Sequence, residues 1–220
     1  MQQLVLDIVA APPPCFDNFV TATNTELVQA ICAMVTEHNH DPQLYLWGAS
    51  GSGKTHLLQA CVHLAHTRGN TAVYLDAIDF SSADNLTFDV IAIDNVELLD
   101  AANQIKLFNL INQVREGKGR LICAGLVAPM QLALRIDLTT RLGWGLIYQI
   151  HSLSEADKLS VLSKHAQARG FNLDSAVADY LIHHWRRDLP SLIAALDSLD
   201  HYSLQTQRPI TVPLLKEALA

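Results

Sequence analysis

Apolar residues follow two different periods along the chain, and the change between them comes near residue 150. Before it, short and nearly continuous apolar runs alternate with segments of helical periodicity. The runs predict strands at 43–48, 71–77, 88–94, 119–125 and 145–150, and the segments between them predict helices at 53–66 and 101–115. Continuous apolar strands separated by helices are typical of a parallel sheet covered on both faces. The first part of the chain is therefore expected to be an α/β domain.

From residue 151 onward the pattern is helical only. Ser154 and Asp157 have the spacing of a capping box at the start of a helix, and Pro213 suits the first turn of a short final helix. A strong apolar stripe at helical spacing is formed by Leu189, Leu192, Ile193, Leu196 and Leu199. Such a stripe predicts a helix that buries one face. We expect a small all-helical subdomain here.

A separate N-terminal segment precedes the first strand. Residues 1–14 end in three consecutive prolines, which favour an extended spacer. Asn24 can cap a helix with Leu27, Ile31 and Met34 on one face. The expected organisation is a flexible tail at 1–14, a nucleotide-binding α/β domain at 15–150 and a helical lid at 151–220.

Composition narrows the classes of function. The net charge of −7 argues against a protein that holds duplex DNA by itself, because phosphate neutralisation supplies most of that affinity. The four cysteines form no C-x-x-C pair, so buried thiols in a reducing compartment are favoured. No signal peptide or apolar run of membrane-spanning length is present. We expect a cytoplasmic protein without a membrane partner.

The stretch GASGSGKT at 48–55 matches the phosphate-binding loop pattern G-x-x-x-x-G-K-[ST]. It follows an expected strand and opens an expected helix, so backbone N–H groups and the helix N-terminus would meet the phosphates. Lys54 would reach the β- and γ-phosphates, and Thr55 would ligate Mg²⁺. The candidate nucleotide-binding residues of this segment are Gly48, Ser50, Gly51, Ser52, Gly53, Lys54, Thr55 and His56.

A second acidic element is expected at the end of the strand in FDVIAIDN. Asp94 ends this strand, where ligands of parallel sheets bind, and is the natural partner of Mg²⁺. The next residue is Asn95, whose amide cannot accept a proton as a carboxylate does. Glu97 is nearby but out of register. Intrinsic hydrolysis is therefore expected to be slow.

Four segments resemble the DnaA-related AAA+ family. They are FDNFVTATN at 16–24, GKTHLLQA at 53–60, RLGWGLIYQI at 141–150 and PITVPLLKEAL at 209–219. The chain is similar to Hda-type members, which lack the DNA-reading domain of the initiator DnaA. The resemblance implies a P-loop AAA+ sheet sandwiched by helices with a helical lid. It further implies a regulator of replication initiation that binds ADP or ATP with Mg²⁺. Such a regulator stimulates ATP hydrolysis by DnaA on the DNA-loaded sliding clamp.

The resemblance also assigns roles to individual residues. Arg141 matches the position of the arginine finger that acts on a neighbour's nucleotide, and Asp137 is expected to cap the short helix carrying it. The alternative for Arg141 is a surface arginine at a helix C-terminus. Phe19 and Val20 match the segment lining the adenine pocket, and the alternative for them is a hydrophobic staple on the first helix.

The N-terminal tip resembles the peptide by which proteins bind the sliding clamp. Its candidate residues are Gln3, Leu4, Leu6 and Ile8. Two or three apolar anchors would fill a pocket on the clamp while the glutamine bonds at its rim. The alternative is an edge strand folded back on the sheet. If the tip binds the clamp, the protein would reach DNA only indirectly.

Two further positions depart from the family pattern. Leu126 stands where a polar residue usually follows the fourth expected strand, and Pro190 stands where the lid usually carries a sensor arginine. Arg186 or Arg187 could reach the phosphates instead. Together these departures favour a stable nucleotide-bound state, with ADP a candidate, over a cycling motor.

Two other classes of function stay open. A DnaC-like helicase loader, or another AAA+ replication ATPase, would bind DNA directly and would need a basic surface. A stand-alone P-loop enzyme such as a kinase would need an acceptor site and a general base, and no residue suggests either. The expected partners are DnaA and the sliding clamp (the β subunit of the polymerase), with a homo-oligomer possible.

Overall fold

The computed structural model describes residues 13–37, 41–80, 88–117, 119–185 and 189–218. By its internal contacts the chain divides into a core unit, Pro13–Ser152, and a C-terminal unit that begins at Leu153. The predicted tip residues Gln3, Leu4, Leu6 and Ile8 lie outside the described residues, and so do Arg186 and Arg187. Each unit is described by itself below.

The core unit contains a five-stranded parallel sheet in the order β2-β3-β4-β1-β5. The strands are β1 (Gln43–Trp47), β2 (Ala72–Asp76), β3 (Val90–Asp94), β4 (Arg120–Gly125) and β5 (Leu146–Gln149). All five lie where apolar runs predicted them, with ends one or two residues shorter. In register, Trp47 pairs with Gly125 and Asp76 with Asp94, so the carboxyl ends of these strands meet at one edge.

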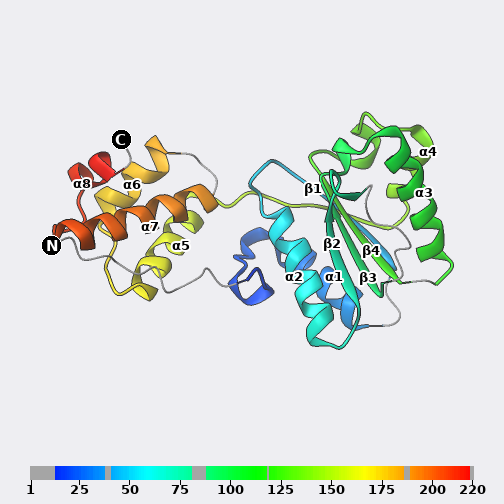
Figure 1. Cartoon of the computed structure of the whole chain (residues 1–220), viewed down its shortest axis with the longest axis horizontal. Helices are drawn as coiled ribbons and strands as arrows, with labels where there is room; N and C mark the ends of the chain where they lie inside the picture. The colour runs from blue at the N-terminus through cyan, green and yellow to red at the C-terminus, as the bar shows by residue number, and fades with distance from the viewer. Residues whose placement is uncertain (1–12, 38–40, 81–87, 118, 186–188, 219–220) are drawn as a thin grey trace. The chain divides into compact units, whose positions relative to one another are not determined.

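Helices cover both faces of the sheet (Figure 1). They are α1 (Thr25–Thr36), α2 (Lys54–Thr67), α3 (Ala101–Arg115) and α4 (Ile136–Leu142). Successive strand residues point to opposite faces, so Leu44 and Leu46 pack with α1 and α2, whereas Tyr45 packs with α3 and α4. The fold class is the predicted one, a parallel sheet between two helical layers.

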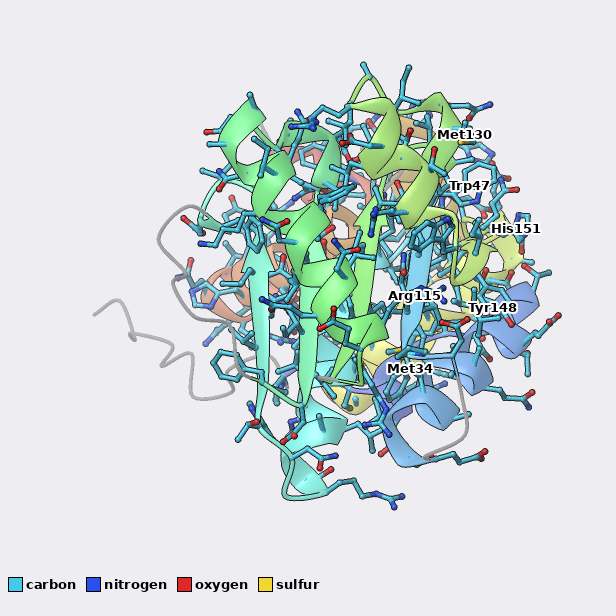
Figure 2. The ribbon with its side chains drawn as sticks, turned by 90° about the vertical axis from the view of Figure 1, so that its right-hand side faces the viewer. Met34, Trp47, Arg115, Met130, Tyr148 and His151 are labelled. Atoms are coloured by element: carbon cyan, nitrogen blue, oxygen red, sulfur yellow. The ribbon has the colours of Figure 1, made fainter. Side chains whose placement is uncertain are left out.

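Asn24 is placed differently from the prediction. It stands at the N-terminal boundary of α1, but its side chain forms no capping hydrogen bond. Instead Nδ2 donates to the carbonyl of His151 at 2.9 Å, and Oδ1 accepts from the His151 N–H at 2.8 Å. The Asn24 amide therefore bonds a residue 127 positions further along the chain, and not the end of the helix where capping preferences place it. Figure 2 labels His151 and, on the neighbouring strand β5, Tyr148.

The C-terminal unit consists of helices only. They are α5 (Glu155–Ala168), α6 (Ser175–His184), α7 (Leu189–Thr206) and α8 (Val212–Ala218). The predicted capping box of Ser154 and Asp157 is present at the start of α5, and Pro213 lies in the first turn of α8. The apolar stripe of α7 places Leu192, Leu196 and Leu199 in the buried core of this unit.

Candidate functional site

The loop between β1 and α2 has the geometry of a phosphate cradle. Gly51 and Gly53 adopt positive φ values of 73° and 103°, which a side chain would strain. A Cβ on Gly53 would also stand 2.9 Å from the Phe19 ring. Trp47, labelled in Figure 2, is the last residue of β1 and directly precedes this loop. Backbone N–H groups at the start of α2 are thus available to an anion.

Lys54 is the buried cation of this loop. Its Nζ donates to the carbonyls of Gly48 at 2.8 Å and Ala49 at 3.0 Å. Burial lowers the pKa of the ammonium, and the nearby Asp94 and Glu97 carboxylates partly oppose this by raising the pKa. Among the described residues, the hydrogen-bond acceptors of this ammonium are thus two neutral carbonyls of its own loop. Phosphate oxygens are stronger acceptors for such a group.

Thr55 and Asp94 meet directly at the carboxyl edge of the sheet. The Thr55 hydroxyl donates to Asp94 Oδ2 at 2.5 Å, and the Tyr74 hydroxyl donates to the same oxygen at 3.1 Å. Asp94 is fully buried. Hydroxyl and carboxylate oxygens at this spacing suit Mg²⁺, which prefers oxygen ligands and shares them with phosphates. The pair therefore fits a metal that a nucleotide would bring.

The other candidate residues of the loop differ in exposure. Ser50 and Gly51 are exposed, whereas Ser52 is buried and its Oγ has no hydrogen-bond partner among the described residues. His56, in the first turn of α2, is half-buried and bonds the Cys15 carbonyl through Nε2 at 3.0 Å. A buried hydroxyl without a protein partner, next to backbone N–H groups, is a suitable donor to a phosphate oxygen.

Phe19 lies beside the phosphate loop. Its ring centroid is 5.4 Å from that of His56, and it packs against the core on the α1–α2 side together with Phe16. Val20 is half-buried in the same segment. The geometry brings the FDNFV segment next to Gly53, as both the adenine-pocket and the staple interpretations require.

Arg141 lies in the last turn of α4, as predicted, far along the sheet from the phosphate loop. Its carbonyl accepts from Gln43 Nε2 at 2.7 Å, and Gln43 is the first residue of β1. The loop follows the other end of β1, about 16 Å away at the usual rise of a strand. The guanidinium is stacked over two rings, 3.9 Å from the Phe108 centroid and 4.7 Å from that of Trp144.

The prediction that Asp137 caps α4 is wrong. The N-cap position is Arg135, and Asp137 lies inside the first turn. Its carboxylate forms a bidentate pair with the Arg135 guanidinium, with N–O distances of 2.7 and 3.1 Å. This pairing lowers the pKa of Asp137. The charged partner two residues earlier in the chain holds the carboxylate away from the backbone N–H groups of a capping position.

Two residues of this region were not found from the sequence. Gln43 is only 1% exposed and fixes the end of α4 to β1, and Tyr74 completes the hydrogen bonds of Asp94. Both lie within apolar strand runs, where a polar group gives no separate signal. The one available sign was a glutamine at the first position of a strand whose other residues are apolar or aromatic.

Two family comparisons match adjoining parts of the chain. Residues 12–149 match the bacterial DnaA ATPase domain, and residues 155–219 match the Hda lid domain. The chain belongs to the DnaA-related AAA+ family, of the Hda type. This confirms the resemblance drawn from the four segments.

Solved structures show the same fold. The chain is 20% identical to domain III of the Thermotoga maritima replication initiation protein DnaA, with a TM-score of 0.80 over 95% of this chain and 96% of that one. It is 21% identical to AMPPCP-bound DnaA from Aquifex aeolicus, with a TM-score of 0.73 over 86% of this chain and 66% of that one.

A third match is the replication initiator DnaA bound to AMPPCP and single-stranded DNA, at 22% identity and a TM-score of 0.76. It covers 86% of this chain but 65% of that one, so the Hda-type chain spans under two thirds of that initiator. Within the described residues, no helix has both the length and the apolar character needed to cross a membrane.

Proposed function

We propose that this Hda-type chain binds adenine nucleotide with Mg²⁺ and stimulates ATP hydrolysis by DnaA on the sliding clamp. Lys54 would hold the β- and γ-phosphates, the Thr55–Asp94 pair would hold the Mg²⁺, and Phe19 would line the adenine side. The metal supplies neutralisation of phosphate charge. The DnaA structures with bound AMPPCP support a nucleotide at this loop.

The observation that carries the proposal is the place of Arg141. It sits at the start of β1, whereas the phosphate loop follows the end of the same strand. An arginine side chain cannot span this distance of about 16 Å. If Arg141 meets a γ-phosphate, that phosphate belongs to another molecule. This supports an action in trans, on the nucleotide of DnaA.

The surroundings of Arg141 are also suited to a finger. Among the described residues it has no carboxylate partner, and two aromatic rings hold its guanidinium instead. A cation–π contact of this kind is worth roughly 0.5–2 kcal/mol, less than a hydrogen-bonded bridge to phosphate. The guanidinium can therefore be held ready and still be given up to a phosphate. Fingers of this kind raise hydrolysis rates by roughly 10³–10⁵.

The test of the finger measures hydrolysis of ATP bound to DnaA, with clamp loaded on DNA, as a function of added Hda-type protein. Arg141→Ala and Arg141→Lys are both expected to lose stimulation by a factor of about 10³, because a lysine cannot reproduce the bidentate fork. Arg115→Ala is the matched control. Arg115 lies over the same Trp144 ring at 5.4 Å but has its own acid, Asp41, at 4.0 Å. Full stimulation by Arg141→Ala would overturn the assignment.

The clamp contact is proposed for Gln3, Leu4, Leu6 and Ile8. A pull-down with purified sliding clamp is expected to capture the full chain and not a chain lacking residues 1–9. Both chains are expected to bind ADP equally, which shows that the core is intact. Equal capture of the two chains would contradict the proposal. With the clamp supplying the route to DNA, the protein would work as an activator of DnaA with weak ATPase of its own.

The alternative of a DnaC-like loader predicts direct DNA binding. A titration with duplex DNA at moderate salt separates the two, since a protein of net charge −7 is expected to show no saturable binding. Saturable binding without clamp would favour the loader.

A further inference from the structure

Glu97 occupies a place in the site that its sequence position did not predict. Asn95, directly after Asp94, adopts the left-handed conformation with φ 54°, and the short 3₁₀ helix Val96–Leu98 follows. The Asn95 amide donates to Asp76 Oδ2 on β2 at 2.6 Å. Glu97 turns the other way, toward β4. Its Oε2 lies 3.1 Å from where a Cβ on Gly125 would stand.

This arrangement puts the carboxylate on the phosphate side of β3. In the strand order β2-β3-β4-β1-β5, β4 lies between β3 and the strand that leads into the phosphate loop. Gly125 ends β4, and its carbonyl accepts from the N–H of Gly48, the first residue of the loop, at 3.3 Å. Asn95, by contrast, is held against the neighbour on the far side.

The Glu97 oxygen is buried without a hydrogen-bond donor. Among the described residues, Oε2 has no partner. A hydroxyl does lie at the end of β4, that of Tyr45, but it donates to the Val127 carbonyl at 3.0 Å. Gly125 has no side chain, and Leu126 is apolar and 45% exposed. The Asp94 and Glu97 charges both act on the buried Lys54 ammonium and raise its pKa, against the lowering by burial.

We infer that Glu97 is a specificity-determining residue that weakens binding of a nucleoside triphosphate relative to the diphosphate. The inference rests on the proposed nucleotide site at the phosphate loop. A carboxylate only accepts hydrogen bonds, as do phosphate oxygens, so the two cannot satisfy each other. A third phosphate would add negative charge on the side of β3 where the Glu97 carboxylate lies, with its Oε2 buried and without a hydrogen-bond partner among the described residues. Like charges repel strongly where water is excluded.

The experiment measures the dissociation constants of ADP and of the non-hydrolysable analogue AMPPCP, by calorimetry with Mg²⁺ on the full, nucleotide-free chain. Glu97→Gln keeps the shape and removes the charge. It is expected to tighten AMPPCP by about tenfold or more while ADP changes less than about threefold. Glu97→Asp keeps the charge and is expected to retain most of the native preference for ADP.

The matched control is Glu116→Gln. Glu116 is the exposed C-cap residue of α3, at the opposite end of that helix from the strand edge that carries the site. Glu116→Gln removes the same charge from the same unit and is expected to leave the dissociation constants of ADP and AMPPCP unchanged. An equal shift of AMPPCP binding in this variant would mean that net charge, not position, governs the preference.

Two other results would overturn the inference. Unchanged affinity for both nucleotides in Glu97→Gln would mean that the carboxylate does not face the third phosphate. Equal weakening of both nucleotides, with a lowered melting temperature, would mean that Glu97 supports the fold of the site. Neither result touches the proposed action of Arg141, which is measured separately on the ATPase of DnaA.

Discussion

In the core unit several polar and charged side chains are buried within the fold, whereas in the described part of the lid unit every buried side chain is apolar. The buried polar side chains are Asn24, Gln43, Ser52, Lys54, Asp94, Asn103 and Thr139. The lid instead keeps its ion pairs at partly exposed positions, such as Arg169 with Asp197 and Asp200. Burial of polar groups costs stability unless they are paired. The core therefore carries groups for a ligand, and the lid is built for packing.

The largest expected effect on stability comes from the apolar interior of the lid. Leu196 is fully buried on α7, and Leu196→Ala is expected to destabilise the lid unit by about 2–5 kcal/mol through lost contacts and the cavity left behind. Hydrogen–deuterium exchange in urea would show faster exchange in peptides of α5–α8 only. Leu204→Ala, on the same helix but 58% exposed, is the control. Faster exchange in β1–β4 as well would contradict the idea that the interior of the lid can open while that of the core stays folded.

In the core unit, removal of the buried polar side chain of Lys54 should reduce ligand binding rather than stability. Lys54→Ala is expected to weaken ADP binding by about a hundredfold or more, equal to roughly 2.7 kcal/mol. The melting temperature without nucleotide should stay constant or rise, because burial already lowers the pKa of this ammonium. Calorimetry and thermal melting measure the two. The control is Lys106→Ala on α3, which should leave ADP affinity unchanged. A fall in melting temperature of several degrees in Lys54→Ala would show instead that Lys54 supports the fold.

Not every buried polar group of the core serves a ligand. Asn24 is 3% exposed and joins the start of α1 to the backbone of His151 by two hydrogen bonds. Asn24→Ala is expected to cost about 1–2 kcal/mol of core stability, measured by urea unfolding, with ADP affinity unchanged in the folded protein. Asn24→Asp keeps the acceptor but buries a charged oxygen opposite the His151 carbonyl oxygen, so it should cost at least as much as Asn24→Ala. A smaller loss in Asn24→Asp would show that the bond from the His151 N–H carries most of the effect.

The predictions from sequence were right for the apolar framework and wrong for several polar side chains. The five strands, the two helical layers and the phosphate loop followed from local patterns, because apolar runs and the G-x-x-x-x-G-K-[ST] spacing depend on near neighbours. The errors involve polar groups with distant or unexpected partners: Asn24 bonds His151 and Asp137 bonds Arg135. By its register Glu97 is expected outside the site, but after the left-handed turn at Asn95 its carboxylate lies at the end of β4. Spacing along the chain cannot show such contacts.

The smallest effect is expected at the surface of the lid, where Arg208 forms a bidentate pair with Glu217 at 2.6 and 3.2 Å. Both side chains are 47% exposed, so water competes for the same bonds, and Arg208→Ala should leave the melting temperature at neutral pH unchanged. The arginine lowers the pKa of Glu217. Any stabilisation from the pair is therefore present above the ordinary pKa of a glutamate and is lost as pH falls through the lowered value.

Arg169→Ala is the comparison for this prediction. The Arg169 guanidinium is more buried and meets two carboxylates, so its loss should cost about 1 kcal/mol. A larger loss in Arg208→Ala than in Arg169→Ala would show that the lid depends on its surface charges rather than on the packing of α7.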